Sequence, residues 1–364
     1  MSISESTKRL GRKPNWLADL ALLAATLLIL FALCEIGIRI VDAVRKSGEA
    51  TATSWAVYDE HLGYRPRPGV DGVNADGLRG DPIETPKRRF RILMLGDSVA
   101  FYGDDAGDTF PGHLQRVLRA DSRLVPHEVL NAGVRGYTNH QELMYLKHYG
   151  VHLEPDLVGV AFVLNDLHRI LHQFKVEDGK IVGQHYTFAD EAVRSVESPI
   201  YQLARKSRFL VWLRRQLSVF DQLIELYAGQ DFSFDYRPDF STAWREEPWR
   251  DIEAQLGEMV ALGRARGFRV FLVAFPFGEQ LRPDYLARNR AYVTYPQKKL
   301  AGIAGRLDIP YLDLFNELDL SQDFDPDRIH LTKRGREVAG KRIARFMIDE
   351  ALVPAAAAHP SRQR

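Results

Sequence analysis

The sequence predicts an α/β protein, a three-layer sandwich in which helices cover both faces of an open, mostly parallel sheet. Two observations carry this prediction. Several short runs are apolar at successive positions, which is typical of parallel strands buried on both faces. Stretches of helical character separate these runs, so that strand and helix alternate along the chain. The predicted strands span residues 90–95, 129–130, 156–164, 269–275 and 309–315.

Residues that stop an extended segment follow several of these strands. Gly96 follows the first strand, Gly133 the second and Pro276 the fourth. Active sites of open α/β sheets lie at the carboxyl ends of the strands, so the residues just after each strand are the first candidates for function. The predicted helices span residues 141–149, 249–266, 287–306 and 333–350.

The composition excludes several classes of protein. The chain has 364 residues, of which 45% are apolar, so it can bury a core and is not disordered throughout. Its 49 basic and 48 acidic residues lack the basic excess of nucleic-acid-binding proteins, and we expect no nucleic-acid partner. A single cysteine cannot form an intramolecular disulfide, a zinc ribbon or an iron–sulfur site.

An apolar segment at residues 16–44 predicts a transmembrane signal anchor. Its centre, residues 20–34, carries no charge, and Asp19 and Glu35 bracket it. A bilayer span needs about 20 residues, so both carboxylates must lie near the interfaces, where they cost less than at mid-bilayer. Basic residues precede the segment, which predicts a single-pass inner-membrane protein with cytoplasmic residues 1–15 and the bulk of the chain on the extracytoplasmic side.

Three alternatives exist for this segment. A cleaved signal peptide needs small residues after its apolar core, and residues 31–35 match that pattern poorly. A lipoprotein signal needs a small residue before the cysteine, whereas Leu33 precedes Cys34. A buried core helix is the third alternative. The signal anchor agrees best with the length and the flanking charges.

Turn signals divide the rest of the chain. Residues 45–88 are polar and turn-rich, and we expect a linker that leads into a small irregular or hairpin segment. Residues 89–350 form the predicted α/β domain, which residues 167–246 interrupt as a cap-like insertion. Residues 200–227 of the insertion predict one or two amphipathic helices, packed on the core or lying on a membrane surface. Residues 351–364 are expected to form a disordered tail.

A serine follows the first predicted strand in the sequence Gly96-Asp97-Ser98. A tight turn there exposes the Ser98 hydroxyl, which is a nucleophile once a general base activates it. His330 and Asp327 follow the last strand, and a turn can bring this carboxylate to one imidazole nitrogen while the other faces Ser98. The alternatives are Ser98 as a helix N-cap, and Asp327 as a cap beside an ordinary surface histidine.

Two further segments offer hydrogen-bond donors for an oxyanion. Gly136 lies in a turn after the second strand, and glycine lets a backbone N–H approach a substrate closely. Asn165 ends the third strand and can direct its side-chain amide into the same crevice. Each residue, taken singly, is more often a turn signal.

The order of these residues along the chain resembles that of the SGNH/GDSL hydrolase family. Ser98, Gly136, Asn165 and His330 each follow a predicted strand, and the resemblance covers about residues 89–350 apart from the insertion. It implies a flavodoxin-like SGNH hydrolase fold with a five-stranded sheet.

The resemblance also implies a role for each residue. Ser98 is the nucleophile, and His330 and Asp327, in the family's Asp-x-x-His pattern, complete the triad. The N–H groups of Ser98 and Gly136 and the side-chain amide of Asn165 are the oxyanion donors.

Asp97 is expected to be structural, with its carboxylate bound to nearby backbone donors. Two departures affect the substrate inference. Val163 replaces the glycine that the family usually has two residues before the asparagine, and residues 99–103 differ from the family pattern after the serine.

Patterns for cofactors and metals are missing from the sequence. It contains no phosphate-binding or dinucleotide-binding glycine motif and no zinc-protease motif. Gly150 separates His148 from His152, which weakens a helical metal pair. The paired carboxylates Asp104 and Asp105 have the pattern of a solvated loop rather than that of a glycosidase pair. We therefore expect neither a cofactor nor a metal.

The sequence thus predicts a membrane-anchored serine esterase that acts on O-acyl, chiefly O-acetyl, esters of envelope or exported glycans. An O-acetyltransferase that uses the same triad and a sugar hydroxyl as acceptor is an alternative. A lipid esterase or lysophospholipase, and a non-catalytic envelope assembly protein on the same fold, are two more. The expected partners are an acylated glycan or lipid substrate and the membrane. The sequence does not indicate a protein partner.

Overall fold

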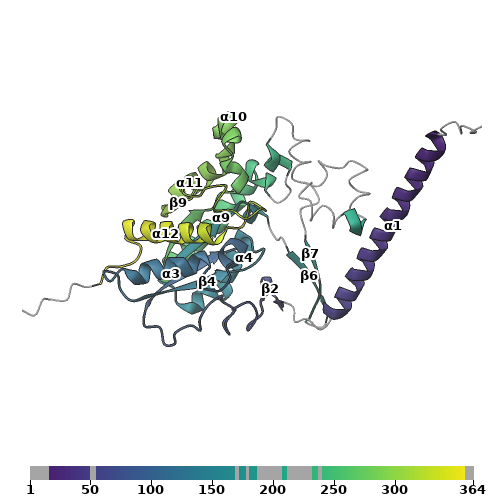
Figure 1. Cartoon of the computed structure of the whole chain (residues 1–364). Helices are drawn as coiled ribbons and strands as arrows, with labels where there is room; N and C mark the ends of the chain where they lie inside the picture. The colour runs from purple at the N-terminus through teal and green to yellow at the C-terminus, as the bar shows by residue number, and fades with distance from the viewer. Residues whose placement is uncertain are drawn as a thin grey trace, which may run out of the picture. The chain divides into compact units, whose positions relative to one another are not determined.

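The computed structural model describes residues 16–49, 55–168, 172–177, 180–186, 207–210, 232–236 and 240–356 (Figure 1). These residues belong to two compact units. One unit contains helix α1 and residues 207–210, and the other contains the remaining described residues.

A five-stranded parallel sheet forms the centre of the larger unit, in the order β4-β3-β5-β8-β9. The five predicted strands are therefore confirmed, with boundaries that shift by a few residues. Nearly every residue of β3 and all of β5 are buried, which explains why these strands are apolar at successive positions. The strands are β3 (Phe90–Gly96), β4 (His127–Gly133), β5 (Leu157–Phe162), β8 (Arg269–Ala274) and β9 (Tyr311–Asp313).

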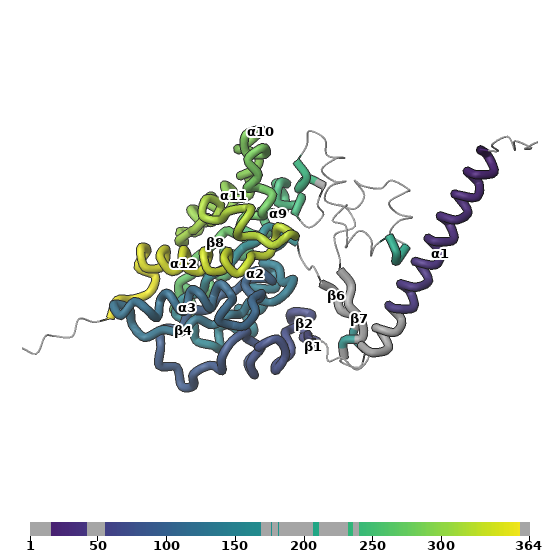
Figure 2. The backbone as a smooth tube through the Cα atoms, in the orientation of Figure 1, coloured from purple at the N-terminus to yellow at the C-terminus, as the bar shows by residue number. Residues whose placement is uncertain are grey.

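Helices cover both faces of the sheet, as the predicted three-layer sandwich requires. Alternate side chains of β3 point to opposite faces, so Ile92 packs with α3 and α12 in one core, and Leu93 packs with α4, α9 and α11 in the other. Figures 1 and 2 show α3 and α12 side by side. These helices are α3 (Phe110–Ala120), α4 (Asn139–His148), α9 (Pro248–Arg266), α11 (Tyr295–Leu307) and α12 (Lys333–Asp349).

Two helices differ from the sequence prediction. Helix α3 was not among the predicted helices; it has Pro111 in its first turn, where proline is well tolerated, and Thr109 caps it. The single helix predicted at residues 287–306 is wrong, since the structure has α10 (Pro283–Val293) followed by α11. Pro296 lies in the first turn of the second helix, where its missing N–H costs nothing.

The strand order reverses next to β3. The chain passes from β3 to β4 on one side and then crosses to β5 on the other, and active sites of open α/β sheets lie at the carboxyl ends of strands at such a reversal. There Gly96 lies beside Gly133 of β4 and Ala161 of β5. The residues that follow these three strands therefore meet at one edge of the sheet.

Part of the segment predicted as linker and hairpin packs on this unit. Strands β1 (Ala56–Asp59) and β2 (Gly63–Pro66) form an antiparallel hairpin. The Tyr64 ring is fully buried, and its hydroxyl donates a hydrogen bond to the carbonyl oxygen of Arg135 at 2.7 Å.

The insertion contributes a second hairpin that the sequence did not predict, β6 (His172–Glu177) with β7 (Lys180–Tyr186). Of the amphipathic helices predicted at residues 200–227, only residues 207–210 are described; the rest lies outside the described residues. At the carboxyl end, Leu124 forms a β-bridge with Ala355, so the first residues of the predicted tail pair with the domain, and residues 357–364 lie outside the described residues.

The smaller unit contains α1 (Trp16–Glu49), a single continuous helix. Residues Trp16–Val41 of α1 are long and apolar enough to cross a membrane, with a mean hydropathy of 2.5 and no burial within the protein. Glu35, near the end of this apolar stretch, accepts hydrogen bonds from the Ser207 hydroxyl and the Phe209 backbone N–H, each at 2.8 Å.

Candidate active site

Ser98 lies just beyond the carboxyl end of β3. Strand β3 ends at Gly96, and Ser98 is the first residue of the short helix α2 (Ser98–Phe101). The Asp97 carboxylate caps this helix by accepting the Val99 N–H at 2.8 Å. Asp97 is thus the N-cap residue, and the alternative in which Ser98 has that role is wrong.

His330 connects Ser98 to Asp327. The Nε2 atom of the imidazole lies 2.9 Å from the Ser98 Oγ atom, and its Nδ1 atom lies 2.5 Å from Asp327 Oδ2. The other carboxylate oxygen of Asp327 accepts the backbone N–H groups of Ile329 and His330 at 2.9 and 3.0 Å. These bonds fix the orientation of the carboxylate, which in turn orients the ring.

His330 and Asp327 each stabilise the charged form of the other. Burial lowers the pKa of His330, but the hydrogen bond and negative charge of Asp327 outweigh that effect, and the pKa lies above its usual value. Burial raises the pKa of Asp327, but hydrogen bonds from His330 and its positive charge bring the pKa below the usual value. Asp327 is therefore ionised at neutral pH and stabilises a positive charge on the imidazole.

Asn165 is linked to the Ser98 turn by a hydrogen bond to Asp97. It lies in the short 3-10 helix Leu164–Leu167 after β5, and its side-chain Nδ2 donates to Asp97 Oδ2 at 3.1 Å. Asp97 is fully buried, and this burial raises its pKa despite the bonds from Val99 and Asn165. An amide nitrogen carries two hydrogens, so Asn165 retains a second donor beside the Ser98 hydroxyl, which lies 3.3 Å from the same Asp97 oxygen.

Gly136 lies in the turn directly after β4. Its φ of +70° falls in the left-handed region that glycine adopts without strain, and the turn closes through a bond from the Tyr137 N–H to the Val134 carbonyl oxygen at 3.0 Å. The parallel register of β3 and β4 places this turn at the same edge of the sheet as Ser98.

Two side chains beside the site were missed by the sequence analysis. Tyr102 packs its ring edge to face against the His330 ring, with centroids 4.7 Å apart, and remains 37% exposed. The Arg135 guanidinium lies 5.3 Å from the Tyr102 ring centroid and forms an ion pair with Asp71 at 2.7 Å. Their positions in the chain, four residues after Ser98 and one before Gly136, were the available signals.

Two buried acids behind Asp97 were also missed. Glu142 on α4 and Asp166 are almost completely buried. Neither Glu142 oxygen has a hydrogen-bond partner in the described part of the chain, and the Asp166 Oδ2 atom accepts the Val163 N–H at 2.7 Å. Burial and the charge of Asp97 raise the pKa of Glu142 well above its usual value, which favours the neutral form of its carboxyl group.

Within the described ranges, no group of three or more histidine, cysteine, aspartate or glutamate side chains is arranged to hold a metal ion. Ser98, His330 and Asp327 form a continuous hydrogen-bonded chain with a serine hydroxyl at one end and a carboxylate at the other. Such a chain can transfer the hydroxyl proton to the imidazole while the oxygen attacks an electrophilic carbon.

Several solved structures share similarity with the chain. A lipase/acylhydrolase from Enterococcus faecalis is 17% identical, with a TM-score of 0.42, over 74% of this chain and 100% of its own. The esterase EstA from a Pseudoalteromonas species is 13% identical, with a TM-score of 0.42, over 72% and 98%. A catalytic mutant of Axe2, an acetylxylan esterase from Geobacillus stearothermophilus, is 16% identical, with a TM-score of 0.41, over 71% and 93%.

No match was found among the curated proteins. The sequence model of the GDSL-like Lipase/Acylhydrolase family matches residues 94–338, a range that extends from β3 into α12 and contains Ser98 and His330. Because this match covers more than half of the chain, the protein belongs to the GDSL-like lipase/acylhydrolase family and is a serine ester hydrolase.

Proposed function

We propose that the protein removes O-acyl groups, chiefly O-acetyl groups, from envelope or exported glycans, and that Ser98, His330 and Asp327 perform the chemistry. The observation that carries the proposal is the hydrogen-bonded chain, with 2.9 Å between His330 Nε2 and Ser98 Oγ and 2.5 Å between His330 Nδ1 and Asp327 Oδ2.

Acylation begins when Ser98 Oγ attacks the ester carbonyl carbon and His330 Nε2 accepts the hydroxyl proton. Asp327 stabilises the imidazolium that forms. The negative charge on the carbonyl oxygen is met by the N–H groups of Ser98 and Gly136 and by the free amide hydrogen of Asn165. The tetrahedral intermediate collapses, His330 returns the proton to the departing sugar oxygen, and Ser98 keeps the acyl group.

Deacylation repeats these steps with water as the nucleophile. His330 accepts a proton from the water, the hydroxide oxygen attacks the acyl carbon, and the bond to Ser98 Oγ breaks as the proton returns to that oxygen. The products are the deacylated glycan and the free carboxylic acid. If a sugar hydroxyl replaces the water, the same residues transfer the acyl group instead.

The proposed location follows from α1. A span of Trp16–Val41 preceded by basic residues is typical of a single-pass anchor with its amino terminus in the cytoplasm. This orientation puts the larger unit outside the inner membrane, where acylated glycans of the envelope are accessible. A periplasm-active reporter fused after residue 60 is expected to be active. If only a cytoplasmic reporter is active at that position, the proposed orientation is wrong.

The test of the chemistry uses the full-length protein in detergent. Wild type is expected to hydrolyse a small aryl acetate and to react with a serine-directed fluorophosphonate, and Ser98→Ala is expected to do neither. Equal labelling of the two proteins would refute the assignment of Ser98. Release of acetate from an acetylated oligosaccharide, compared with release of fatty acid from a long-chain ester or lysophospholipid, tests the substrate class.

Adding a non-acetylated oligosaccharide to the aryl acetate reaction separates hydrolysis from transfer. Hydrolysis predicts that the yield of free acetate stays equal to that of the aryl alcohol. A yield of acetate below that of the alcohol, together with acetylated oligosaccharide, would identify a transferase.

A further inference from the structure

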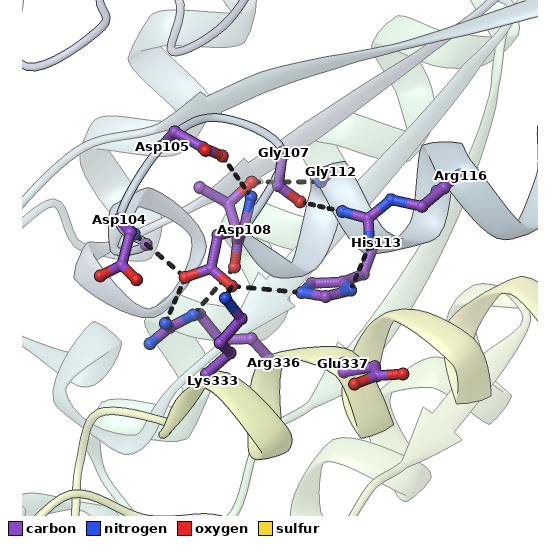
Figure 3. Close-up of polar contacts among 12 residues, drawn as sticks. Asp104, Asp105, Gly107, Asp108, Gly112, His113, Arg116, Lys333, Arg336 and Glu337 are labelled. Carbon is purple, nitrogen blue, oxygen red and sulfur yellow. Dashed lines mark hydrogen bonds and ion pairs between the residues drawn. The ribbon is translucent and has the colours of Figure 1, made fainter.

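One buried guanidinium joins the two chain segments that carry Ser98 and His330. Arg336, on the first turn of α12, is only 8% exposed. Its Nε and Nη2 atoms donate to the carbonyl oxygen and the Oδ2 atom of Asp108, at 2.9 and 2.5 Å. Its Nη1 atom donates to the Leu331 carbonyl oxygen at 2.6 Å. Figure 3 shows the Arg336 side chain extending from α12 to the Asp108 carboxylate.

Both partners of Arg336 adjoin the hydrogen-bonded chain described above. Leu331 directly follows His330. Asp108 lies in the loop between α2, which begins at Ser98, and α3. In sequence 228 residues separate Asp108 from Arg336, so this contact forms only when the two ends of the domain come together.

The loop on the Ser98 side is itself closed by Asp108. Its Oδ2 atom accepts the Asp104 N–H at 3.0 Å, and its own N–H donates to Asp105 Oδ1 at 2.8 Å. Asp108 therefore fixes the shape of its loop as well as the link to α12. Arg336 therefore binds a residue that is itself bonded to two other positions of the loop.

Among the cationic side chains near Asp108, Arg336 is the one that forms hydrogen bonds with it. Burial raises the pKa of Asp108, but the Asp104 N–H and Arg336 outweigh it and bring the pKa below its usual value. Lys333 Nζ and His113 Nε2 lie 4.0 and 3.6 Å from Asp108 Oδ1, too far for a hydrogen bond. Lys333 is also 72% exposed, so water screens its charge.

We infer that Arg336 is a positioning residue for the esterase reaction: it holds the His330 turn against the Ser98 loop so that Nε2 stays within hydrogen-bonding distance of Oγ. The inference rests on the proposed function of Ser98 and His330. A displacement of about 1 Å between reacting groups can lower a rate about 100-fold, so a rigid link between these segments has a direct catalytic consequence.

The test replaces the whole ion pair, because removing one partner would leave a buried charge and could unfold the protein. In the double variant Asp108→Leu/Arg336→Met, apolar side chains of similar size replace the pair, a change that often preserves folding. We expect a folded protein whose kcat for an aryl acetate is on the order of 10- to 100-fold lower, with little change in KM. Lys333→Met is the matched control and is expected to retain the wild-type kcat.

The pH profile provides a second readout. The bonds between Asp327 and His330 lie within one turn, so the rise of kcat/KM with pH is expected at the same pH in the double variant as in wild type. If the rise occurs at a different pH in the double variant, the substitutions have changed the pKa of His330, and the positioning role is refuted. Wild-type kcat in a folded double variant would also refute it.

A single variant keeps the test decisive if the double variant does not fold. Arg336→Lys retains the charge but lacks the fork that reaches both segments. We expect its kcat per folded molecule to fall by at least about 5-fold at an unchanged KM, and wild-type kcat would overturn the inference. Wild type and Ser98→Ala are assayed in parallel, because absence of a Ser98-dependent reaction in wild type would refute the proposed function rather than the role of Arg336.

Discussion

The Nε2 atom of His330 lies 2.9 Å from the Oγ atom of Ser98, although 232 residues separate them in the chain. Ser98 follows strand β3, and His330 lies in a turn just before α12. The sheet thus brings a weak nucleophile and its proposed base together before any substrate binds.

The pH dependence of hydrolysis tests the proposed base. Only neutral His330 can accept the Ser98 proton, so kcat/KM should rise with pH through the His330 pKa. Burial lowers this pKa, but Asp327 raises it more, so the rise is expected above the ordinary histidine value of about 6.5. In Asp327→Asn the rise should move to lower pH, with a much lower kcat. A rise that stays in place in this variant would contradict the assigned role of Asp327.

Replacing the proposed oxyanion donor should affect the transition state more than the bound substrate. In Asn165→Ala we expect kcat to fall on the order of 100- to 1000-fold with a small change in KM, because the donor acts on charge that develops during the reaction. Steady-state kinetics on an aryl acetate measure both constants. Thermal unfolding is the control, since Asn165 also donates to buried Asp97 at 3.1 Å. Unchanged kcat in a folded variant would exclude Asn165 from the oxyanion site.

The buried acid Glu142 should make folding stability depend on pH. Burial raises its pKa in the folded state, while the unfolded chain releases the proton near pH 4.3. Stability is therefore lost as pH rises from that value towards the folded-state pKa. In Glu142→Gln this loss should disappear, so the variant gains on the order of 1 kcal/mol relative to wild type between pH 5 and pH 8.

Chemical unfolding at several pH values measures that difference. Glu128→Gln is the matched control, because Glu128 is also buried but forms an ion pair with Arg91 at 2.7 Å. It should be less stable than wild type at pH 8, since it leaves the Arg91 charge buried without its partner. Parallel pH curves for wild type and Glu142→Gln would show that Glu142 does not titrate between the two states.

The smaller unit predicts a specific cross-link on α1. The rings of Phe31 and Phe209 lie 5.6 Å apart, and Glu35 binds the Phe209 N–H one helical turn further on. In a Cys34→Ser background, cysteines at positions 31 and 209 should react with a short bifunctional maleimide in membranes. A protease site introduced between residues 49 and 55 detects the cross-link, because the two fragments then stay joined.

The position of the cysteine on the helix is the control for that experiment. Leu33 lies two residues along α1 and therefore points to a different side from Phe31, so cysteines at positions 33 and 209 should cross-link much less. Glu35→Ala should reduce the 31–209 cross-link, since it removes the acceptor for the segment that carries Phe209. Equal yields for both cysteine pairs would contradict the contact.

Local patterns were sufficient for most of the fold. The apolar runs at β3, β5 and β8 predicted strands because a strand buried on both faces must be apolar at every position. Local patterns did not predict α3 or the break between α10 and α11. In both cases a proline lies at the start of a helix, where it is favourable, whereas its local signal is that of a turn.

The sequence by itself determined the strands, the apolar N-terminal helix and the order of Ser98, Gly136, Asn165 and His330 after the strands, because these depend on local chemistry and hydrophobic periodicity. Tertiary structure alone decided the contacts among them and added the partners that no local pattern marks. The burial of Glu142 and the link from Arg336 to Asp108 exist only once distant segments pack and exclude water. Burial shifts pKa values, and the distances between side chains set the geometry of the reacting groups. Both arise only when the whole domain packs, so no short segment of the sequence can predict them.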